Sequence, residues 1–418
     1  MSLVLNDVAK FMTSKIDVSE INETNYVSTE NMISNKGGIT IASSLPDTKS
    51  VRKYLPKDIL INNIRPYFKK IWYSDMEGGC SNDVFVIRSN ENYDSKFLYY
   101  VLSSDDFFSY VMANAKGTKM PRGDKKAIQN YEVPDFSIDE QKRISFVLGE
   151  IDKKIEINKR INKNLDDILD LLFKEKFINN FSNNPFNWEI KKIKEIPLII
   201  TDYVANGSFA SLKENVSILD YPDYAYFIRN TDLKSKTFEK FVNKHSYDFL
   251  KKSSLFGNEV IISNVGDVGS VFLCPFLDKP MTLGNNMILV KSKDNTLNLN
   301  YYLYLLFRSN YGQYLLSTIT SGSVQLKFNK TEFKSLELTM PPDEEINSFN
   351  ELAIPLFEHK KVISSEIEKL QRLRDTLLPK LMSNEIDVSE INCDMIVIIN
   401  SINNFRFNPS NYLVEVII

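Results

Sequence analysis

The chain has 418 residues, enough for two or three domains with cores of their own, and its 43% hydrophobic and 25% charged residues are ordinary for a globular protein. A net charge of −3 at pH 7 excludes a uniformly basic nucleic-acid binder, so nucleic acid could be held only by local clusters of Lys and Arg. The sequence has no run of about 18 apolar residues, no secretory leader and no CxxC pair among its three cysteines, which predicts a cytoplasmic protein without a membrane span, disulfide framework or zinc site.

The second half of the sequence repeats the first at an offset of roughly 200 residues, a period far longer than that of solenoid repeats. Residues 79–89, GCSNDVFVIRS, are echoed by residues 283–292, LGNNMILVKS, and Gly117 has its counterpart in Gly322. A long helical pattern follows each copy. The repeat predicts a duplicated domain plus helix, and a duplicated binding domain implies a target in two parts.

Each copy begins with short strands, continues with an aromatic helix and a glycine-containing loop, and ends with another short strand before the long helix. Strand and helix patterns mixed in this way predict two small α+β domains. We expect strands at residues 59–61, 84–87 and 131–133 with a helix at 97–112 in the first copy, and strands at 260–262, 287–290 and 336–338 with a helix at 301–316 in the second.

Two long helices are the clearest elements. The first begins at a capping box, in which Ser137 accepts from the backbone while Glu140 reaches back. Apolar residues then recur at alternating spacings of four and three, as in a coiled coil, with two Asn positions that would set register and orientation. A weaker seam follows residue 343. The predicted seam residues are Ile144, Leu148, Ile151, Ile155, Asn158, Asn162, Leu165 and Leu169 in the first helix and Leu356, Ile363, Ile367, Leu370 and Leu377 in the second.

A heptad seam needs a partner, and the sequence contains two such helices. We expect them to pack on each other, antiparallel, with the two copies related by a pseudo-two-fold axis in a circular arrangement; an intermolecular coiled coil is the alternative. The predicted boundaries are residues 1–136 for the first globular domain, 137–184 for the first long helix and linker, 185–342 for the second globular domain, 343–392 for the second long helix and 393–418 for a divergent tail.

Three segments mimic catalytic motifs, and the chemistry argues against each of them. Residues 134–142 contain the acids and lysine of a PD-(D/E)xK nuclease, but the glutamate and lysine fall in the first turn of the long helix instead of around a metal on neighbouring strands. Residues 184–188 resemble the NPP(Y/F) motif of adenine methyltransferases without its second proline, and residues 266–269 lack phosphate-loop spacing. With only His245 and His359 in the chain, we predict a non-catalytic protein that binds no metal or cofactor directly.

Basic residues gather in two places in the first copy: seven Lys and Arg against one Asp over residues 49–70, and five against one Asp over residues 116–126. The second cluster lies at the loop after Gly117, and the loop after Gly322 occupies the same place in the second copy. Arg and Lys grip phosphates or read guanine and Asn and Gln read adenine, so this pair of loops favours DNA binding, with a solvated surface loop as the alternative. The candidate DNA-binding residues are Lys36, Arg65, Lys69, Lys70, Lys119, Arg122, Lys125, Arg229, Asn264, Gln325, Lys327, Asn329 and Lys330.

Three segments resemble the specificity (S) subunits of type I restriction–modification systems. Residues 26–32, YVSTENM, resemble a stretch common in the first target-recognition domain of that family; residues 140–144, EQKRI, match the EQxxI opening of its central helix; and residues 377–382, LLPKLM, resemble the end of its distal helix. The resemblance covers residues 1 to about 392. It implies two target-recognition domains, each reading one half of a bipartite, asymmetric DNA site, and two helices that set the spacing between the half-sites.

The resemblance also implies partners for the chain. In the family, the long helices dock two methyltransferase (M) subunits, and restriction (R) subunits join them to form the nuclease. S-adenosylmethionine, ATP and Mg²⁺ are then expected in partner subunits, and double-stranded DNA is expected in contact with this chain. The S subunit itself catalyses nothing.

Two features depart from the family pattern. Residues 345–349 read EINSF where EQxxI is expected, which bears on docking at the second helix, and residues 393–418 resemble neither copy. The heptapeptide IDVSEIN occurs at residues 16–22 and again at 386–392, which fits either circular symmetry or a recombination scar. Two other functions stay open: a non-catalytic coiled-coil scaffold whose globular ends bind proteins, and an orphan S-like protein that binds methyltransferase without reading DNA.

Overall fold

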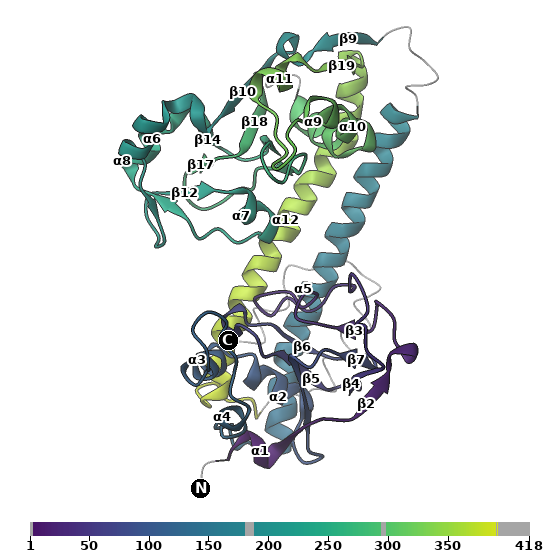
Figure 1. Ribbon diagram of the computed structural model, residues 1–418, viewed down its shortest axis with the longest axis vertical. Helices are drawn as coiled ribbons and strands as arrows, with labels where there is room; N and C mark the ends of the chain where they lie inside the picture. The colour runs from purple at the N-terminus through teal and green to yellow at the C-terminus, as the bar shows by residue number, and fades with distance from the viewer. Residues whose placement is uncertain (1–2, 180–187, 294–297, 390, 392–418) are drawn as a thin grey trace. The chain divides into compact units, whose positions relative to one another are not determined.

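The computed structural model describes residues 3–179, 188–293, 298–389 and 391, and the chain forms two units (Figure 1). Unit 1 comprises residues 1–157 together with 366–418, and unit 2 comprises residues 158–365. Each long helix therefore contributes one part to each unit. The predicted tail at 393–418 and the NPFN segment at 184–187 lie outside the described residues.

Two four-stranded sheets of short strands form the centre of unit 1. The first sheet has the order β1 (Ala9–Phe11), β8 (Val84–Ser89), β5 (Ile59–Asn62), β6 (Ile71–Tyr73), and all its neighbours are antiparallel. The second has the order β2 (Lys15–Asp17), β4 (Ser50–Tyr54), β7 (Gly78–Cys80), β3 (Tyr26–Val27), with β3 and β7 parallel. Ile59 and Ile61 of β5 lie in one core cluster and Leu60 in another, which is why this strand reads as a continuous apolar run.

Side-chain caps decide where the helices of unit 1 begin. Besides the short α1 (Leu5–Val8), unit 1 contains α2 (Ser95–Leu102), α3 (Asp105–Ala113) and α4 (Lys125–Gln129). The side chains of Asp94, Ser104 and Asp124 accept backbone N–H groups in the first turns of α2, α3 and α4. The single helix predicted over residues 97–112 is therefore two helices, because the Ser103 hydroxyl bonds back to the Tyr100 carbonyl and Ser104 starts a new helix.

Unit 2 repeats the first sheet of unit 1 and enlarges the second. Its first sheet has the order β10 (Leu198–Asp202), β18 (Met287–Ser292), β15 (Val260–Ser263), β16 (Val271–Leu273), again fully antiparallel. A five-stranded sheet follows, with the order β11 (Ile218–Leu219), β13 (Phe241–Val242), β12 (Ala225–Ile228), β17 (Met281–Leu283), β14 (Ser254–Leu255). A third, two-stranded sheet pairs β9 (Glu189–Lys192) with β19 (Glu337–Met340).

In unit 2, as in unit 1, polar side chains cap the starts of helices. They are α6 (Phe209–Asn215), α7 (Asn230–Ser235), α8 (Lys244–Phe249), α9 (Leu299–Arg308), α10 (Asn310–Ile319) and α11 (Lys330–Ser335). The helix predicted over residues 301–316 is likewise divided, because Ser309 accepts from the Gly312 N–H and begins α10. Any side chain at Gly312 would collide with the backbone of Leu306, so the sharp turn between α9 and α10 requires glycine there.

In unit 1 the first part of α5 (Ile138–Phe173) packs antiparallel against the last part of α12 (Asp343–Met382). Ile144, Leu148, Ile151 and Ile155 of α5 are buried in one core cluster with four leucines of α12: Leu370, Leu377, Leu378 and Leu381. The predicted capping box is confirmed, because the Ser137 N–H donates to Glu140 Oε2 at 2.9 Å and the Glu140 N–H donates to Ser137 Oγ at 3.4 Å. Glu140 is thus a helix cap.

In unit 2 the last part of α5 packs antiparallel against the first part of α12. Leu169 and Phe173 share a core cluster with Phe349 and Phe357, and Asn162 Nδ2 donates to Ser364 Oγ at 3.1 Å. The predicted seam is buried at Asn158, Leu165, Leu169 and Ile363 and half-buried at Asn162 and Leu356; in unit 1, Ile367 is half-buried. The α+β class, with two repeated domains and two long antiparallel helices, is confirmed.

Candidate nucleic-acid interface

One five-residue loop is built in the same way in each unit. In unit 1 the loop spans residues 117–121, and Lys116 and Arg122 close it with two backbone hydrogen bonds of 2.8 and 2.9 Å. In unit 2 the loop spans residues 322–326, and Ser321 and Lys327 close it with two bonds of 2.9 Å. We call these segments the tip loops.

Both tip loops open on a glycine for a backbone reason. Gly117 has φ of 92° and Gly322 has φ of 108°, a region that side chains with a Cβ rarely adopt. A Cβ on Gly322 would also lie 2.3 Å from the carbonyl oxygen of Gln325, inside the same loop. The equivalent glycines therefore start two tip loops of equal length.

The base of each tip loop is tied to the loop that follows β5 in unit 1 and β15 in unit 2. In unit 1 Arg122 forms a β-bridge with Ile64, and the Arg65 N–H donates to the Pro121 carbonyl at 2.8 Å. The corresponding links in unit 2 join Lys327 to Val265, and the Gly266 N–H to the Leu326 carbonyl at 2.9 Å. Because the links match one to one, each residue of one tip loop has a counterpart in the other.

The tip loops differ in what they expose. In unit 1 the exposed side chains are those of Thr118, Lys119 and Met120, with Met120 48% exposed. In unit 2 they are Ser323, Val324, Gln325 and Leu326, and Val324 is 100% exposed. The two units thus present different chemistry from the same framework.

A turn with an unusual backbone lies beside the tip loop of unit 1. Arg65 and Lys69 flank the short helix Pro66–Phe68, and both have left-handed backbones, with φ of 50° and 49°. Such conformations are strained for residues other than glycine and gather at functional sites. The turn exposes Tyr67 and Phe68, whose ring centroids lie 4.7 Å apart. Cations beside exposed aromatic rings suit contact with nucleic acid.

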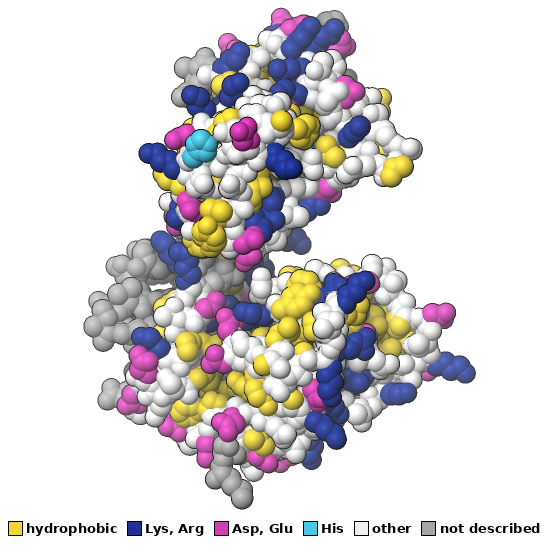
Figure 2. All heavy atoms as spheres, turned by 60° about the vertical axis from the view of Figure 1, so that its left-hand side comes forward, with side chains coloured by type: hydrophobic (Ala, Val, Ile, Leu, Met, Phe, Trp, Pro, Cys, Tyr) yellow, Lys and Arg dark blue, Asp and Glu magenta, His cyan; other side chains and the backbone are white. Residues whose placement is uncertain are grey.

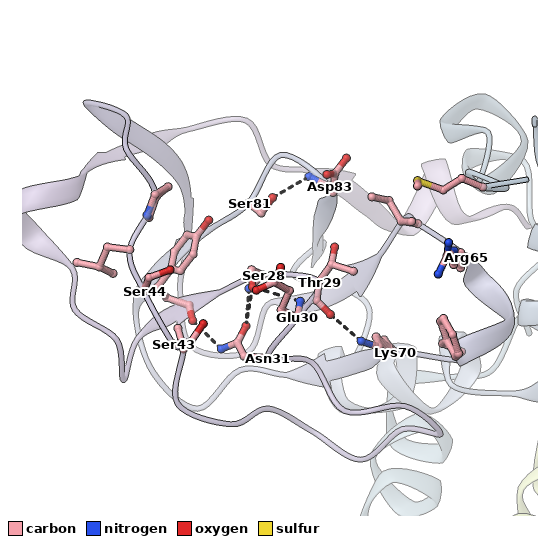
Figure 3. Close-up of a pocket in the computed structure, with 17 residues that line it drawn as sticks. Ser28, Thr29, Glu30, Asn31, Ser43, Ser44, Arg65, Lys70, Ser81 and Asp83 are labelled. Carbon is pink, nitrogen blue, oxygen red and sulfur yellow. Dashed lines mark hydrogen bonds between the residues drawn. The ribbon is translucent and has the colours of Figure 1, made fainter. Parts of the chain in front are cut away.

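A hollow of about 610 Å³ lies between this turn and the loops that follow β3 (Figure 3). Its wall includes Ser28, Thr29, Glu30 and Asn31, most of the segment that resembles the target-recognition domain. Lys70 Nζ donates to the Thr29 carbonyl at 2.6 Å, and burial lowers the pKa of Lys70. Further polar and apolar side chains complete the lining, among them Ser43, Ser44, Arg65, Phe68, Ser81, Asp83 and Met120. The hollow therefore brings cations, hydroxyls and amides together beside the tip loop.

Asn31 and Arg65 both lie in the wall of the hollow, and they differ in their hydrogen bonding. The Asn31 amide donates to the carbonyls of Tyr26 and Thr40 and accepts from the Ser28 N–H at 2.6 Å, so this wall is rigid. The Nε atom of Arg65 is buried and has no hydrogen-bond partner among the described residues. A buried, unpaired guanidinium nitrogen is costly, and a bound phosphate or base edge would satisfy it.

Among the predicted DNA-binding residues, those of the tip loops face solvent. Lys119, Arg122, Gln325 and Lys327 are exposed, and Arg122 lies 3.4 Å from Asp83. Figure 2 shows Lys and Arg side chains gathered along one side of unit 1, next to exposed hydrophobic side chains. Lys119 and Arg122 give the tip loop of unit 1 and its closing position two exposed cations.

Several other candidates are engaged within the fold. Lys36 and Lys69 both pair with Asp105, at 3.1 and 2.9 Å, and Arg229 grips Asp232 with its Nε 2.9 Å from Oδ2. Lys125 lies over the Phe11 ring, and the Asn264 amide donates to the Phe328 carbonyl. The Asn329 side chain accepts first-turn N–H groups of α11, and Lys330 pairs with Asp202. These contacts compete with DNA, so the tip loops are the better candidates.

The structure adds residues that sequence reasoning missed. Tyr67, Phe68 and Val324 are exposed at the candidate interface, and none of them is among the DNA-binding candidates predicted from the sequence. The available signal was a valine among small and polar residues in the loop after Gly322, and an Arg-Pro-Tyr-Phe-Lys run in a basic cluster. The hollow could have been suspected only from the resemblance of residues 26–32.

The described residues contain no group of three or more His, Cys, Asp or Glu side chains placed to hold a metal ion. Burial raises the pKa of Cys80 to about 12 and that of Cys274 well above its usual value, which makes both thiols poor nucleophiles. Within the described part of the chain, no helix is long and apolar enough to cross a membrane.

Comparison with known proteins finds a matching family model and several similar proteins. The family model of the type I restriction modification DNA specificity domain matches residues 4–167 and 185–380. The MjaIX specificity subunit of Methanocaldococcus jannaschii is 27% identical over 321 residues, covering 71% of this chain and 70% of that protein, and the HindI specificity subunit of Haemophilus influenzae is 21% identical over 465 residues, covering 91% and 98%. The crystal structure of a type I restriction–modification S subunit from M. genitalium superposes with a TM-score of 0.53 at 15% identity, covering 91% of this chain and 96% of that one.

Proposed function

This chain belongs to the family of type I restriction–modification DNA specificity subunits, and we propose that each of its two units reads one half of a bipartite, asymmetric DNA site. The observation that supports this division is the pair of tip loops, which share one backbone framework and expose different side chains. A duplicated framework with altered side chains is what two readers of different half-sites require, because phosphate contacts position a protein while base contacts specify the sequence.

Cations around the tip loops would hold the phosphates. In unit 1 the candidates are Arg65 and Arg122, and in unit 2 the candidate is Lys327. Neutralising phosphates releases counterions, so DNA affinity should fall linearly on a log–log salt plot. The net charge of −3 does not oppose this, because the positive charge is local.

We propose that the long helices carry the partner subunits and set the gap between half-sites. Each helix contributes to both units, so its length determines how the two readers are spaced. The α5 and α12 helices also expose apolar side chains in unit 2: Ile168, Leu171, Leu352 and Val362. Exposed apolar residues on helices already packed together suit docking of methyltransferase subunits.

The chemistry of the complex would lie in those partners. Methyl transfer from S-adenosylmethionine to adenine belongs to M subunits and ATP-driven cleavage with Mg²⁺ to R subunits, while this chain chooses the DNA. The described residues fit that division, because the motifs that mimic catalytic sites are a helix cap at Glu140 and a turn between β15 and β16 at residues 266–269. We expect the complex to act in the cytoplasm, where chromosomal DNA and these partners meet.

Co-expression with the cognate M subunit, followed by methylome sequencing, tests the proposal. We expect one bipartite modified motif, and Lys119→Ala with Arg122→Ala should relax one half of it while leaving the other half unchanged. Lys327→Ala is the reciprocal variant and should affect the other half. In DNA-binding titrations the Lys119→Ala/Arg122→Ala variant should lower the log–log salt slope by about 1–2.

Three results would argue against the proposal. If the wild-type chain directs no modified motif, the proposal that it reads DNA is wrong. Equal loss at both half-sites in either variant would contradict one reader per unit. Binding that ignores salt would favour a protein-binding scaffold.

A further inference from the structure

We propose that the third residue of each tip loop, and in unit 2 also the fourth, read bases directly, so that Val324 and Gln325 of unit 2 recognise A·T pairs and Lys119 of unit 1 recognises a guanine. This inference rests on the proposed function and deepens it by naming the bases. Counted from the opening glycine, Lys119 and Val324 occupy the third position, and Met120 and Gln325 the fourth.

The equivalence of these positions is structural. Both tip loops open at a left-handed glycine and close five residues later at a β-bridge, between Lys116 and Arg122 or between Ser321 and Lys327. The closing residue of each is a cation that also bridges to the loop after β5 or β15. A cation at the base of the loop suits a phosphate, which leaves the exposed side chains within the loop to contact bases.

Packing in a core does not explain why an apolar residue stands at position 324. Its side chain is 100% exposed, and Leu326, two residues further on, is 52% exposed, so neither is buried in a core. Exposed apolar surface gains its stabilisation only when a partner removes it from water. In the major groove the apolar group is the C5 methyl of thymine, and small aliphatic side chains contact it.

Gln325 has an amide available for a ligand. It is exposed, and none of its side-chain atoms hydrogen-bonds to another described residue. Its Nε2 lies beside Gly266, where an added Cβ would be 3.5 Å away, an ordinary van der Waals distance. A Gln amide pairs with both N6 and N7 of adenine, and no other base presents that donor and acceptor pattern.

Unit 1 carries different chemistry at the same positions. Lys119 is exposed and makes no hydrogen bond or ion pair with another described residue. A Lys ammonium donates to O6 and N7 of guanine, which is among the commonest specific contacts in the major groove. Met120 lines the hollow, so in this unit the fourth side chain turns toward the protein. The half-sites should therefore differ in composition at the positions under the tip loops.

Backbone hydrogen bonds hold both tip loops in one conformation in the absence of DNA. Their backbones are held by the paired hydrogen bonds at the closing bridge and by a further bond to the preceding loop, from the Arg65 N–H in unit 1 and from the Gly266 N–H in unit 2. A preformed loop loses little conformational freedom on binding, so more of the contact energy remains for discrimination between bases.

Point variants in the full chain, assembled with the M subunit, test the assignment. Methylome sequencing of the wild type first defines the two half-sites. Gln325→Ala should then relax one A·T position in one half by about fivefold or more, which is the discrimination that a bidentate pair provides. The other half should stay unchanged, and so should binding of the M subunit.

Modified oligonucleotides separate the two contacts. Deoxyuridine in place of thymine removes only the C5 methyl, and 7-deaza-adenine removes only N7. The wild type should lose affinity for each modified site, Val324→Ser, which removes both methyl groups, should become insensitive to deoxyuridine, and Gln325→Ala should become insensitive to 7-deaza-adenine. Ser323→Ala, at the neighbouring exposed position, is the matched control and should respond like the wild type.

A transplant tests the tip loop as a unit. Replacing residues 118–121, TKMP, by SVQL keeps the glycine, the length and the closing bridge. The half-site of unit 1 should then lose its guanine requirement and accept an A·T pair in its place. If the transplant fails to fold, the point variants still decide the question.

The outcomes distinguish this inference from the proposed function. A wild-type chain that directs methylation to a bipartite motif, combined with Val324→Ser and Gln325→Ala variants that read it unchanged, overturns the inference and leaves the function standing. A wild-type chain that directs no motif overturns both.

Discussion

Residues of one type play different parts in this molecule. Lys119 projects from a tip loop, whereas Lys36 and Lys69 converge on the Asp105 carboxylate and Lys125 lies over the Phe11 ring, 5.0 Å from its centroid. Their partners are as far as 114 positions away in the chain, as for Lys125 and Phe11. A basic residue in a sequence therefore marks a candidate, and its neighbours in space decide whether it is available to DNA.

Asp267 of unit 2 carries a prediction at this scale. Its carboxylate accepts from Lys234 at 2.6 Å, from Ser270 Oγ at 2.7 Å and from Asn230 at 3.1 Å, and these donors lower its pKa to about 2. A depressed pKa means that the stabilisation is complete above the ordinary value of 3.8 and is lost as the pH falls toward 2.

Asp267→Asn should therefore lower the melting temperature at pH 6–7, and the gap from the wild type should narrow as the pH falls below 4. Thermal unfolding of both proteins at a series of pH values measures this. Asp47→Asn, at an exposed side chain of unit 1, is the control and should leave the melting temperature nearly unchanged. A gap between the wild type and Asp267→Asn that stays constant down to pH 2.5 would refute the assignment.

At the scale of elements, polar clasps join the paired helices inside each unit. In unit 1 the Asp152 carboxylate of α5 accepts from Arg374 Nη1 of α12 at 2.9 Å and from the Tyr100 hydroxyl at 2.7 Å. Burial and the nearby Asp152 charge raise the pKa of Tyr100, so its hydroxyl remains a donor. In unit 2 Asp166 of α5 pairs with Lys360 of α12. Such polar contacts in an apolar seam define which residues lie opposite each other.

Removing one partner of the unit 1 clasp should destabilise it. Arg374→Leu leaves Asp152 without its cation at a site where both side chains are mostly buried, and we expect a loss of about 2–3 kcal/mol in the free energy of unfolding, somewhat below that for a fully buried pair. Urea denaturation measures the change. Arg372→Leu is the matched control, since Arg372 is 80% exposed and its loss should change stability by less than about 0.5 kcal/mol.

A second variant checks that the charge is responsible. Asp152→Asn in the Arg374→Leu background removes the unpaired charge while keeping an acceptor for Tyr100. It should recover part of the lost stability. If it makes the protein still less stable, packing of the Arg374 side chain rather than its charge holds the clasp.

At the scale of the whole molecule, each unit contains a part of both long helices. This interleaving means that the chain cannot be cut into its two units without dividing both helices, and both helices therefore belong to both units. The proposed role in setting the half-site gap follows from that arrangement.

Insertion of one heptad in each helix tests the spacing role. Seven residues placed after Ile157 in α5 and seven after Ser365 in α12 preserve the seam and lengthen each helix by about 10 Å. We expect the methylated motif to keep both half-sites and to gain about three base pairs in its gap, at 3.4 Å per pair. Methylome sequencing gives the answer directly.

A four-residue insertion at both places serves as the control, because it breaks the heptad register and should reduce methylation at any gap. Full methylation at the original gap in the heptad variant would show that helix length does not set the spacing.

The sequence by itself determined what depends on neighbouring residues. The seams of α5 and α12 and the capping box at Ser137 and Glu140 were predicted, because periodicity and capping involve residues three to seven positions apart. The repeat and the α+β class were predicted from the similarity of the two halves and from their mixed strand and helix patterns. The serine caps that divide the aromatic helices are also local contacts, although they were not predicted from the sequence. Only the tertiary structure decided which cations face solvent, how the closing bridges tie the tip loops to the rest of each unit and where the hollow lies. These features depend on contacts between distant segments, such as Arg122 with Ile64 or Lys36 with Asp105, and no local pattern encodes them.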